Sequence, residues 1–173
     1  IEKYYGTGLI DGVTTNPTLI KKSGYDPEEV YRKIALIGVD DISMEIVTDD
    51  SYEFLKEGRR LKEKFGEITT IKVPCTPEGL KACKLLSKEG IRVNVTLIFS
   101  AAQAVLASKA GAAYVSPFVG RVDDNSFDGL RLIEEIANIY ETQSRLYNFV
   151  DTEILSASIR NVGSVSKSFE YGA

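Results

Sequence analysis

Short strand-like segments alternate with helix-like segments along nearly the whole chain, and this alternation limits the possible folds more than any other sequence feature. Some helix starts are recognisable, because Asp26 and Thr76 each offer an N-cap oxygen directly before a proline. Strand followed by helix, repeated six times, predicts a parallel sheet that is either doubly wound or closed as a barrel. We expect strands at residues 12–16, 42–47, 69–74, 92–98, 114–119 and 153–158.

The polarity of these strands favours the barrel. Helices cover both faces of a doubly wound sheet, so its central strands are almost continuously apolar. Here one face of the strands is polar, while the other face carries apolar residues such as Val93, Val95 and Leu97. We therefore predict a (β/α)8 TIM-type barrel, a single domain over residues 1–173 that is truncated at both ends and lacks the first and last strands. The polar face carries Thr14, Asn16, Ser43, Glu45, Thr70, Lys72, Asn94, Thr96, Ser116, Ser156 and Ser158.

The composition excludes several classes of chemistry. The chain has 173 residues and no histidine, which excludes Ser-His-Asp and Cys-His nucleophile systems and every His-ligated metal site. A formal net charge of −4 gives no indication of a nucleic-acid partner. Cys75 and Cys83 match neither a paired metal motif nor a disulfide framework, so we expect a cytoplasmic protein. We expect no membrane partner, because no apolar segment is long enough to span a bilayer.

Lys72 is the strongest candidate for a catalytic group. It lies in the middle of the strand expected at residues 69–74, where its side chain is too short to reach water from a barrel interior. Burial disfavours the ammonium form, and a neutral amine in a shielded pocket attacks carbonyl carbons. Lys72 is therefore predicted to be a Schiff-base nucleophile. The structural alternative is a lysine on an edge strand whose head lies in water.

Further polar residues on the same face suit proton transfer and sugar binding. Glu45 can carry protons to and from a carbinolamine, directly or through a water held by Thr96. Alternatively, Glu45 only pairs with Lys72 and does no chemistry. Asn16 and Asn94 can hydrogen-bond to the hydroxyl groups of a polyol, or they can simply satisfy backbone groups.

Two arginines and a serine suggest an anion site. Arg121 follows the strand expected at residues 114–119, while Ser158 and Arg160 end the last strand, just before a helix expected to begin near Asn161. Two guanidinium groups, a hydroxyl and the amides of a helix start suit a phosphate group. The structural alternative is that these arginines form surface ion pairs.

Five segments of the sequence together match a known family. They are residues 12–17, 71–74, 94–103, 116–121 and 157–161. In their order and spacing they resemble the small transaldolases and the related fructose-6-phosphate aldolases. The similarity runs through almost the whole chain, and five linked motifs are far more specific than any one of them.

The resemblance implies a class I aldolase-type barrel that uses no metal and no organic cofactor. Lys72 would form a Schiff base with the C2 carbonyl of a ketose phosphate, and Glu45 would move protons through a water near Thr96. After cleavage between C3 and C4, a dihydroxyacetone unit would stay on Lys72 until an aldose phosphate takes it up. The implied substrate contacts are Thr14, Asn16, Asn94, Ser116 and Phe118. The implied phosphate contacts are Arg121, Ser158 and Arg160.

Two residues favour transfer over simple cleavage. Within the family, Glu45 and Phe118 stand where transaldolases typically have these residues, whereas the aldolases have glutamine at the position of Glu45. The resemblance thus implies a transaldolase of the pentose phosphate pathway, in homo-oligomers such as pentamers or decamers. The family's aspartate that handles the C4 hydroxyl proton lies on a strand that would precede Ile1. The alternatives are a fructose-6-phosphate aldolase and a non-catalytic sugar-phosphate-binding protein.

Overall fold

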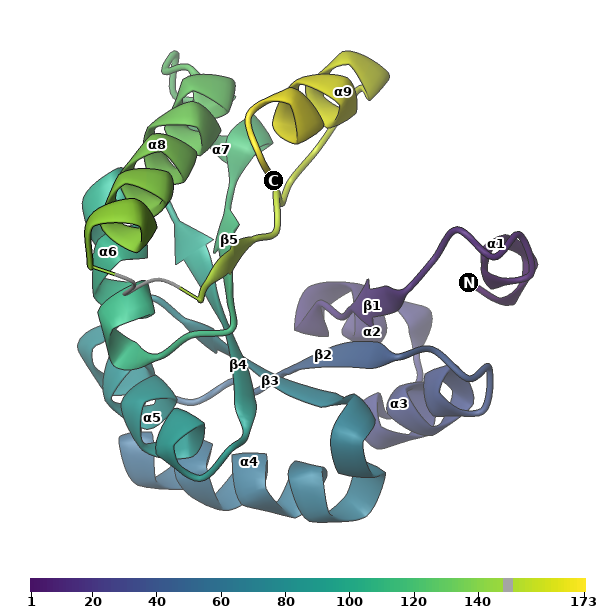
Figure 1. Ribbon diagram of the computed structural model, residues 1–173. Coiled ribbons are helices and arrows are strands. Elements are labelled where there is room, and N and C mark those ends of the chain that lie inside the picture. The colour runs from purple at the N-terminus through teal and green to yellow at the C-terminus, as the bar shows by residue number, and fades with distance from the viewer. Residues whose placement is uncertain (148–150) are drawn as a thin grey trace.

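The computed structural model describes residues 1–147 and 151–173, and the described residues form one parallel sheet of 6 strands. Each strand pairs with the next strand along the chain, which is the strand order of a barrel and confirms the expected architecture. The described sheet is curved and open, so it forms part of a barrel wall (Figure 1). The strands are β1 (Gly12–Thr14), β2 (Asp41–Glu45), β3 (Thr69–Pro74), β4 (Arg92–Ile98), β5 (Tyr114–Pro117) and β6 (Glu153–Ile154).

Helices connect the strands, and α4, α5, α6 and α8 lie on the convex side of the sheet (Figure 1). Apolar strand residues face these helices and are fully buried, among them Ile42, Met44, Ile71, Val93 and Val95. The hydrophobic core therefore lies between the sheet and the helices. Within the described residues, no helix has the length and apolar character that crossing a membrane requires. The helices are α1 (Glu2–Tyr5), α2 (Pro17–Ser23), α3 (Pro27–Ala35), α4 (Ser51–Phe65), the 3-10 helix η1 (Gly66–Ile68), α5 (Pro77–Lys88), α6 (Ala101–Ala110), α7 (Val119–Asp123), α8 (Gly129–Tyr147) and α9 (Val162–Glu170).

The helix starts expected from the sequence are present. The Asp26 carboxylate accepts hydrogen bonds from the N–H groups of Glu28 and Glu29, at 2.9 and 3.2 Å. Thr76 Oγ1 accepts one from the N–H of Gly79 at 3.1 Å. In both helices the proline occupies the first turn, where a missing N–H costs no hydrogen bond.

One expectation about β4 is wrong, because the strand contains a β-bulge. Thr96 pairs with Ser116 and Ile98 pairs with Pro117, so Leu97 is an extra residue with a left-handed φ of 60°. An extra residue reverses the alternation of side chains beyond it. Leu97 was expected on the apolar face, yet Ile98 occupies the core there and is 0% exposed.

The last two strands are also shorter than expected. β5 ends at Pro117, which has no N–H to extend the ladder, and Val119 already begins α7. After the two residues of β6, the pairing continues only as an isolated bridge between Phe118 and Ala157. Ser156 and Ser158 therefore lie beyond β6 in irregular chain.

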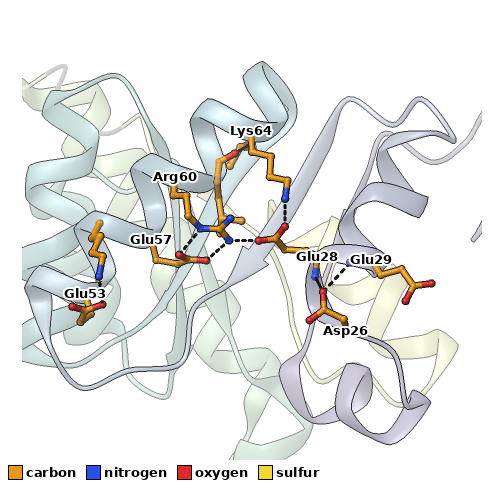
Figure 2. A network of polar contacts seen from close by, with 10 residues as sticks. Asp26, Glu28, Glu29, Glu53, Glu57, Arg60 and Lys64 are labelled. Atoms are coloured by element: carbon orange, nitrogen blue, oxygen red, sulfur yellow. Dashed lines mark hydrogen bonds and ion pairs between the residues drawn. The ribbon is translucent and has the colours of Figure 1, made fainter.

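A network of ion pairs joins α3 to α4, as Figure 2 shows. The Glu28 carboxylate on α3 contacts both Lys64 and Arg60 on α4. Arg60 also donates to both carboxylate oxygens of Glu57, at 2.7 and 2.8 Å. The hydrogen bond from Lys64 is the main reason that the pKa of Glu28 lies below its usual value. Glu28 thus links two neighbouring helices with one charge.

We expect Glu28→Gln to lower the free energy of unfolding by about 0.5–1 kcal/mol at pH 7, the usual range for a partly exposed ion pair. Because the folded protein lowers the pKa of Glu28, this contribution is present above the carboxyl's usual pKa of 4.5 and disappears as the pH falls through the lowered value. Urea unfolding at pH 7 and at about pH 2.5 measures both effects. Glu63→Gln, at an exposed position of α4, is the control. Equal losses in the two variants would contradict the bridging role.

Candidate active site

Lys72 and Glu45 form an ion pair inside the curved sheet. The two residues are direct register partners on β3 and β2, and Lys72 Nζ lies 2.9 Å from Glu45 Oε2. Only 8% of the Lys72 side chain and 16% of the Glu45 side chain are exposed. An edge-strand lysine with its head in water does not describe this residue. The amine lies on the concave side of the sheet, as the strand alternation predicted.

A backbone group that sequence reasoning missed binds the same amine. Lys72 Nζ donates a hydrogen bond to the carbonyl oxygen of Thr15 at 3.1 Å. The buried Thr15 is held in turn by its hydroxyl, which donates to the carbonyl oxygen of Ser43 at 2.8 Å. Because β1 ends at Thr14, strand alternation no longer determines the direction of Thr15. No side-chain pattern in the sequence indicates a carbonyl that accepts from a lysine.

Asn94 connects three strands at the middle of the concave face. Its Nδ2 donates to Ser43 Oγ on β2 at 3.2 Å, and its Oδ1 accepts from Ser116 Oγ on β5 at 2.8 Å. All three residues are at most 2% exposed. An amide has two donor hydrogens and two acceptor lone pairs, so Asn94 keeps one of each for a ligand. Both partners of Asn94 are side chains. The alternative, in which Asn94 only hydrogen-bonds to backbone groups, therefore does not apply.

Asn16 combines a structural contact with a place at the site. Its Oδ1 accepts from the N–H of Leu19 at 3.1 Å and so caps the N-terminus of α2. Capping uses the carbonyl end of the amide and leaves the two Nδ2 hydrogens available. The half-buried Asn16 also lines the large cavity described below.

Two buried oxygen atoms on the strands beside that of Lys72 have unused hydrogen-bonding capacity. Glu45 Oε2 contacts Lys72 at ion-pair distance but accepts no hydrogen bond, and Thr96 Oγ1 has no partner among the described residues. These residues belong to β2 and β4, the two strands that flank β3. Buried polar atoms are normally hydrogen-bonded, so exceptions deserve a functional explanation.

A cavity of about 560 Å³ opens beside Lys72 on the concave side. Its size and mixed polar and apolar lining fit a small-molecule site. Glu45, Asn94 and Thr96 are not part of its lining; Glu45 contacts Lys72, and Asn94 contacts Ser116. The predicted residues that line it are Thr14, Asn16, Lys72, Ser116, Phe118, Arg121 and Ser158.

The predicted anion site is divided in this structure. Arg121 lines the cavity, where its guanidinium carbon lies 5.3 Å from the centre of the Phe118 ring. Ser158 lines the cavity as well. Arg160 does not, because its guanidinium binds both carboxylate oxygens of Asp124 at the surface. This hydrogen-bonded pair lowers the pKa of Asp124. In this structure Arg160 therefore follows the alternative interpretation, in which the arginine forms a surface ion pair.

A second polar cluster lies at the amino ends of the strands. The Asp41 carboxylate accepts from Thr70 Oγ1 at 2.7 Å and lies 3.1 Å from Arg92 Nη2, and burial raises its pKa. These residues lie two positions or more before Glu45, Lys72 and Asn94 on the same face of their strands. The alternation of side chains along each strand could therefore have predicted this cluster. Neither here nor elsewhere in residues 1–147 and 151–173 do three acidic or cysteine side chains come together in a way that could hold a metal ion.

A comparison of the whole sequence with protein families identifies a family that fits this arrangement of residues. The model described as "Transaldolase/Fructose-6-phosphate aldolase" matches residues 1–171. The chain belongs to this family. Among curated members of the transaldolase/fructose-6-phosphate aldolase family, the chain is 47% identical over 173 residues to a "Probable transaldolase" of Nitrosopumilus maritimus, covering 100% of this chain and 76% of the relative. A "Probable transaldolase" of Ruegeria pomeroyi is 52% identical over 166 residues, covering 96% of this chain and 74% of that protein.

Solved structures support the fold of this transaldolase/aldolase family member. A mandelate oxidase variant with 2-hydroxy-phenylacetamide superposes with a TM-score of 0.59 at 16% sequence identity, covering 82% of this chain and 49% of that one. A second variant, with 4-Br-2-hydroxy-methylphenylacetate, gives a TM-score of 0.58 at 17% identity, covering 82% of this chain and 50% of that one. The chain therefore spans about half the length of these structures. At such low identity the likeness concerns the fold alone.

We expect Thr15→Val to lower the free energy of unfolding by about 1–2 kcal/mol, because it leaves the buried Ser43 carbonyl without its hydroxyl donor. Thr15→Ser keeps that donor and should lose clearly less. Urea unfolding of the two variants and the parent protein measures the difference. A larger loss in Thr15→Ser than in Thr15→Val would mean that the methyl group of Thr15, rather than its hydrogen bond, stabilises this loop.

Proposed function

We propose that the protein is a transaldolase, which transfers a dihydroxyacetone unit from a ketose phosphate to an aldose phosphate through a Schiff base on Lys72. One observation carries the proposal: a buried lysine amine borders a cavity and is held by a carboxylate, in a chain of the transaldolase/aldolase family. Amines in shielded sites are suited to attack on carbonyl carbons. Fructose 6-phosphate and sedoheptulose 7-phosphate are the donors that we propose, as part of the pentose phosphate pathway.

Glu45 has the position needed for the proton transfers of Schiff-base formation. A carboxylate 2.9 Å from the amine stabilises the ammonium, so the resting site is an ion pair. Transfer of one proton from the ammonium to Glu45 gives the free amine, which attacks C2. The former carbonyl oxygen takes this proton from Glu45, and the nitrogen then gives one proton back to the carboxylate, which leaves a neutral carbinolamine and a protonated Glu45. Loss of this oxygen as water, protonated from Glu45, leaves the iminium. Thr96 Oγ1, which has no other partner among the described residues, can hold a water that relays these protons.

Hydrogen bonds to sugar hydroxyls would orient the donor. Asn16 offers two N–H groups at one side of the cavity, while Ser116 offers its hydroxyl oxygen at another and is oriented by its hydrogen bond to Asn94 behind it. Thr14 lines the same cavity. Such groups can grip the carbanionic dihydroxyacetone unit after cleavage between C3 and C4, until an aldose phosphate arrives. Acidic Glu45 and aromatic Phe118 favour transfer over release, because the resemblance connects both with transaldolases.

The phosphate would bind to Arg121 and Ser158. Arg121 lines the cavity and forms no ion pair within the described residues, so its guanidinium fork is available to an anion. Arg160 can add a second fork only if it exchanges the Asp124 carboxylate for the phosphate. Assembly into pentamers or decamers and a cytoplasmic location stay predictions.

Borohydride reduction in the presence of fructose 6-phosphate should attach a single adduct of the dihydroxyacetone unit or the whole sugar to Lys72. Reduction converts the iminium to a stable secondary amine, which peptide mass mapping can assign. Lys72→Met should show no adduct, while Lys81→Met, on the exposed side of α5, should be labelled like the parent protein. Unmodified parent protein at saturating sugar would remove the catalytic proposal and leave the sugar-phosphate-binding alternative.

Assays with and without an acceptor aldehyde should distinguish transaldolase activity from aldolase activity. With fructose 6-phosphate alone, little free dihydroxyacetone should appear, because the unit stays on Lys72 until an acceptor takes it. Adding erythrose 4-phosphate should start rapid turnover to sedoheptulose 7-phosphate. Rapid release of free dihydroxyacetone without an acceptor would identify a fructose-6-phosphate aldolase instead.

Arg121→Ala should raise KM for fructose 6-phosphate by about tenfold or more, the loss expected for one charge-assisted contact of about 1.4 kcal/mol. KM for unphosphorylated fructose should change little.

Asp124→Asn should lower KM for the phosphorylated sugar, because it releases Arg160. Steady-state kinetics with both sugars test these effects, and parallel losses for both in Arg121→Ala would contradict a phosphate contact.

A further inference from the structure

A pair of aromatic rings separates the cavity at Lys72 from a second cavity. The second cavity has a volume of about 550 Å³, and both cavities are bordered by Arg121. Phe118 borders the first cavity, and Phe99 borders the second. The ring centres lie 5.8 Å apart with an angle of 63° between the ring planes, which is an edge-to-face contact. The two rings therefore form a wall between two spaces of similar size.

The bulge in β4 explains how Phe99 comes to lie there. In a regular strand Phe99 would share the helix-facing side with Val93 and Val95. The extra residue Leu97 reverses this alternation, which puts Ile98 into the core. Phe99 is left outside the core, 44% exposed, where it borders the second cavity. A left-handed φ is unfavourable for leucine, so the surrounding contacts must maintain this backbone.

Both rings are attached to well-fixed backbone. The N–H of Phe99 donates to Gln103 Oε1 at 2.8 Å, and Gln103 belongs to the capping box of α6. The N–H of Phe118 donates to the carbonyl oxygen of Ile98 at 3.0 Å, which ties the end of β5 to the bulged strand. Phe118 also lies against the Arg121 guanidinium. The wall is therefore part of a fixed framework.

The second cavity differs from the first in its chemistry. Its lining includes apolar side chains, of which Phe127 is 74% exposed, and the charged side chains of Arg131, Asp128 and Glu135. Arg131 has only a long contact of 3.4 Å with Glu135 and is itself largely exposed. Without the wall, this space would accept an apolar or aromatic chain that continues past Arg121.

We propose that Phe99 is a specificity-determining residue for the acceptor aldehyde, because its ring packs behind Phe118 and holds that ring in place at the Arg121 end of the reaction cavity. The inference rests on the proposed function and deepens it. If Arg121 holds the acceptor's phosphate, the aldehyde chain must end near this arginine. Phe99 then excludes acceptors whose chains continue beyond it, above all unphosphorylated aldehydes with an aryl tail.

Phe99→Ala should redirect acceptor selectivity. With fructose 6-phosphate as donor, we compare kcat/KM for erythrose 4-phosphate and for 3-phenylpropanal. The ratio should shift toward 3-phenylpropanal by about tenfold or more, the range of discrimination that a few apolar contacts provide. The shift should arise mainly from a lower KM for the aryl aldehyde, with KM for the donor unchanged. Phe99→Tyr keeps the ring and should keep the selectivity of the parent protein.

The second cavity has its own control. Phe127→Ala alone should leave the acceptor ratio unchanged, because the wall still separates Phe127 from the reaction cavity. Combined with Phe99→Ala, it should remove part of the gain, because Phe127 then borders the space that the aryl tail enters. Circular dichroism checks folding, and Phe99→Leu, with a smaller side chain, should show part of the shift if the alanine variant does not fold.

Borohydride trapping separates failure of this inference from failure of the proposed function. Every Phe99 variant that folds should still form the Lys72 adduct with fructose 6-phosphate, because Phe99 does not line the cavity at Lys72. An intact adduct with an unchanged acceptor ratio would overturn the role of Phe99 alone. Absence of the adduct in the parent protein would overturn the proposed function and this inference together.

Discussion

The ion pair between Lys72 and Glu45 is the interaction on which the rest of the site depends. Two charges removed from water are tolerated only when they are close to each other and supported by further polar contacts. Parallel pairing of β2 and β3 puts these residues directly opposite each other, and the Thr15 carbonyl is a second partner of the amine. Removing either charge would leave the other buried and unpaired. The concave side of the sheet must therefore stay polar, while the convex side holds the apolar core.

The concave side is organised in levels along the strands. Asp41, Thr70 and Arg92 fill the level at the amino ends, and the linked side chains of Ser43, Asn94 and Ser116 lie above them. Lys72 and Glu45 lie in the level toward the carboxyl ends. Hydrogen bonds within the lower levels satisfy most of their buried polar atoms. Unused capacity occurs at Glu45 Oε2, beside the amine, and at Thr96 Oγ1 on the neighbouring strand, where a substrate or water can use it.

Strand periodicity explains both what the sequence could predict and what it could not. Alternation of period two located every strand and put Lys72, Glu45 and Asn94 on one face, because each lies inside a regular strand. It failed wherever the backbone departs from a strand, as at the Leu97 bulge and at Thr15 beyond β1. The pair of Arg160 with Asp124 joins residues 36 positions apart, and no local pattern indicates such a contact. The predicted roles of the site residues rest on the family resemblance and on chemistry, and they stay predictions.

Irregular backbone occurs at the cavity and at the end of a strand beside it, and its stability there has a physical cause. Leu97 follows Thr96, and Ser158 lines the cavity; both have a left-handed φ without being glycine. Gly120 allows the close approach that Ser158 requires, since a Cβ at residue 120 would lie 2.4 Å from the Ser158 carbonyl oxygen. Strained backbone persists only where surrounding contacts hold it. The regular sheet and its helices supply those contacts. The core therefore stabilises backbone conformations at Leu97 and Ser158 that are unfavourable for these residue types.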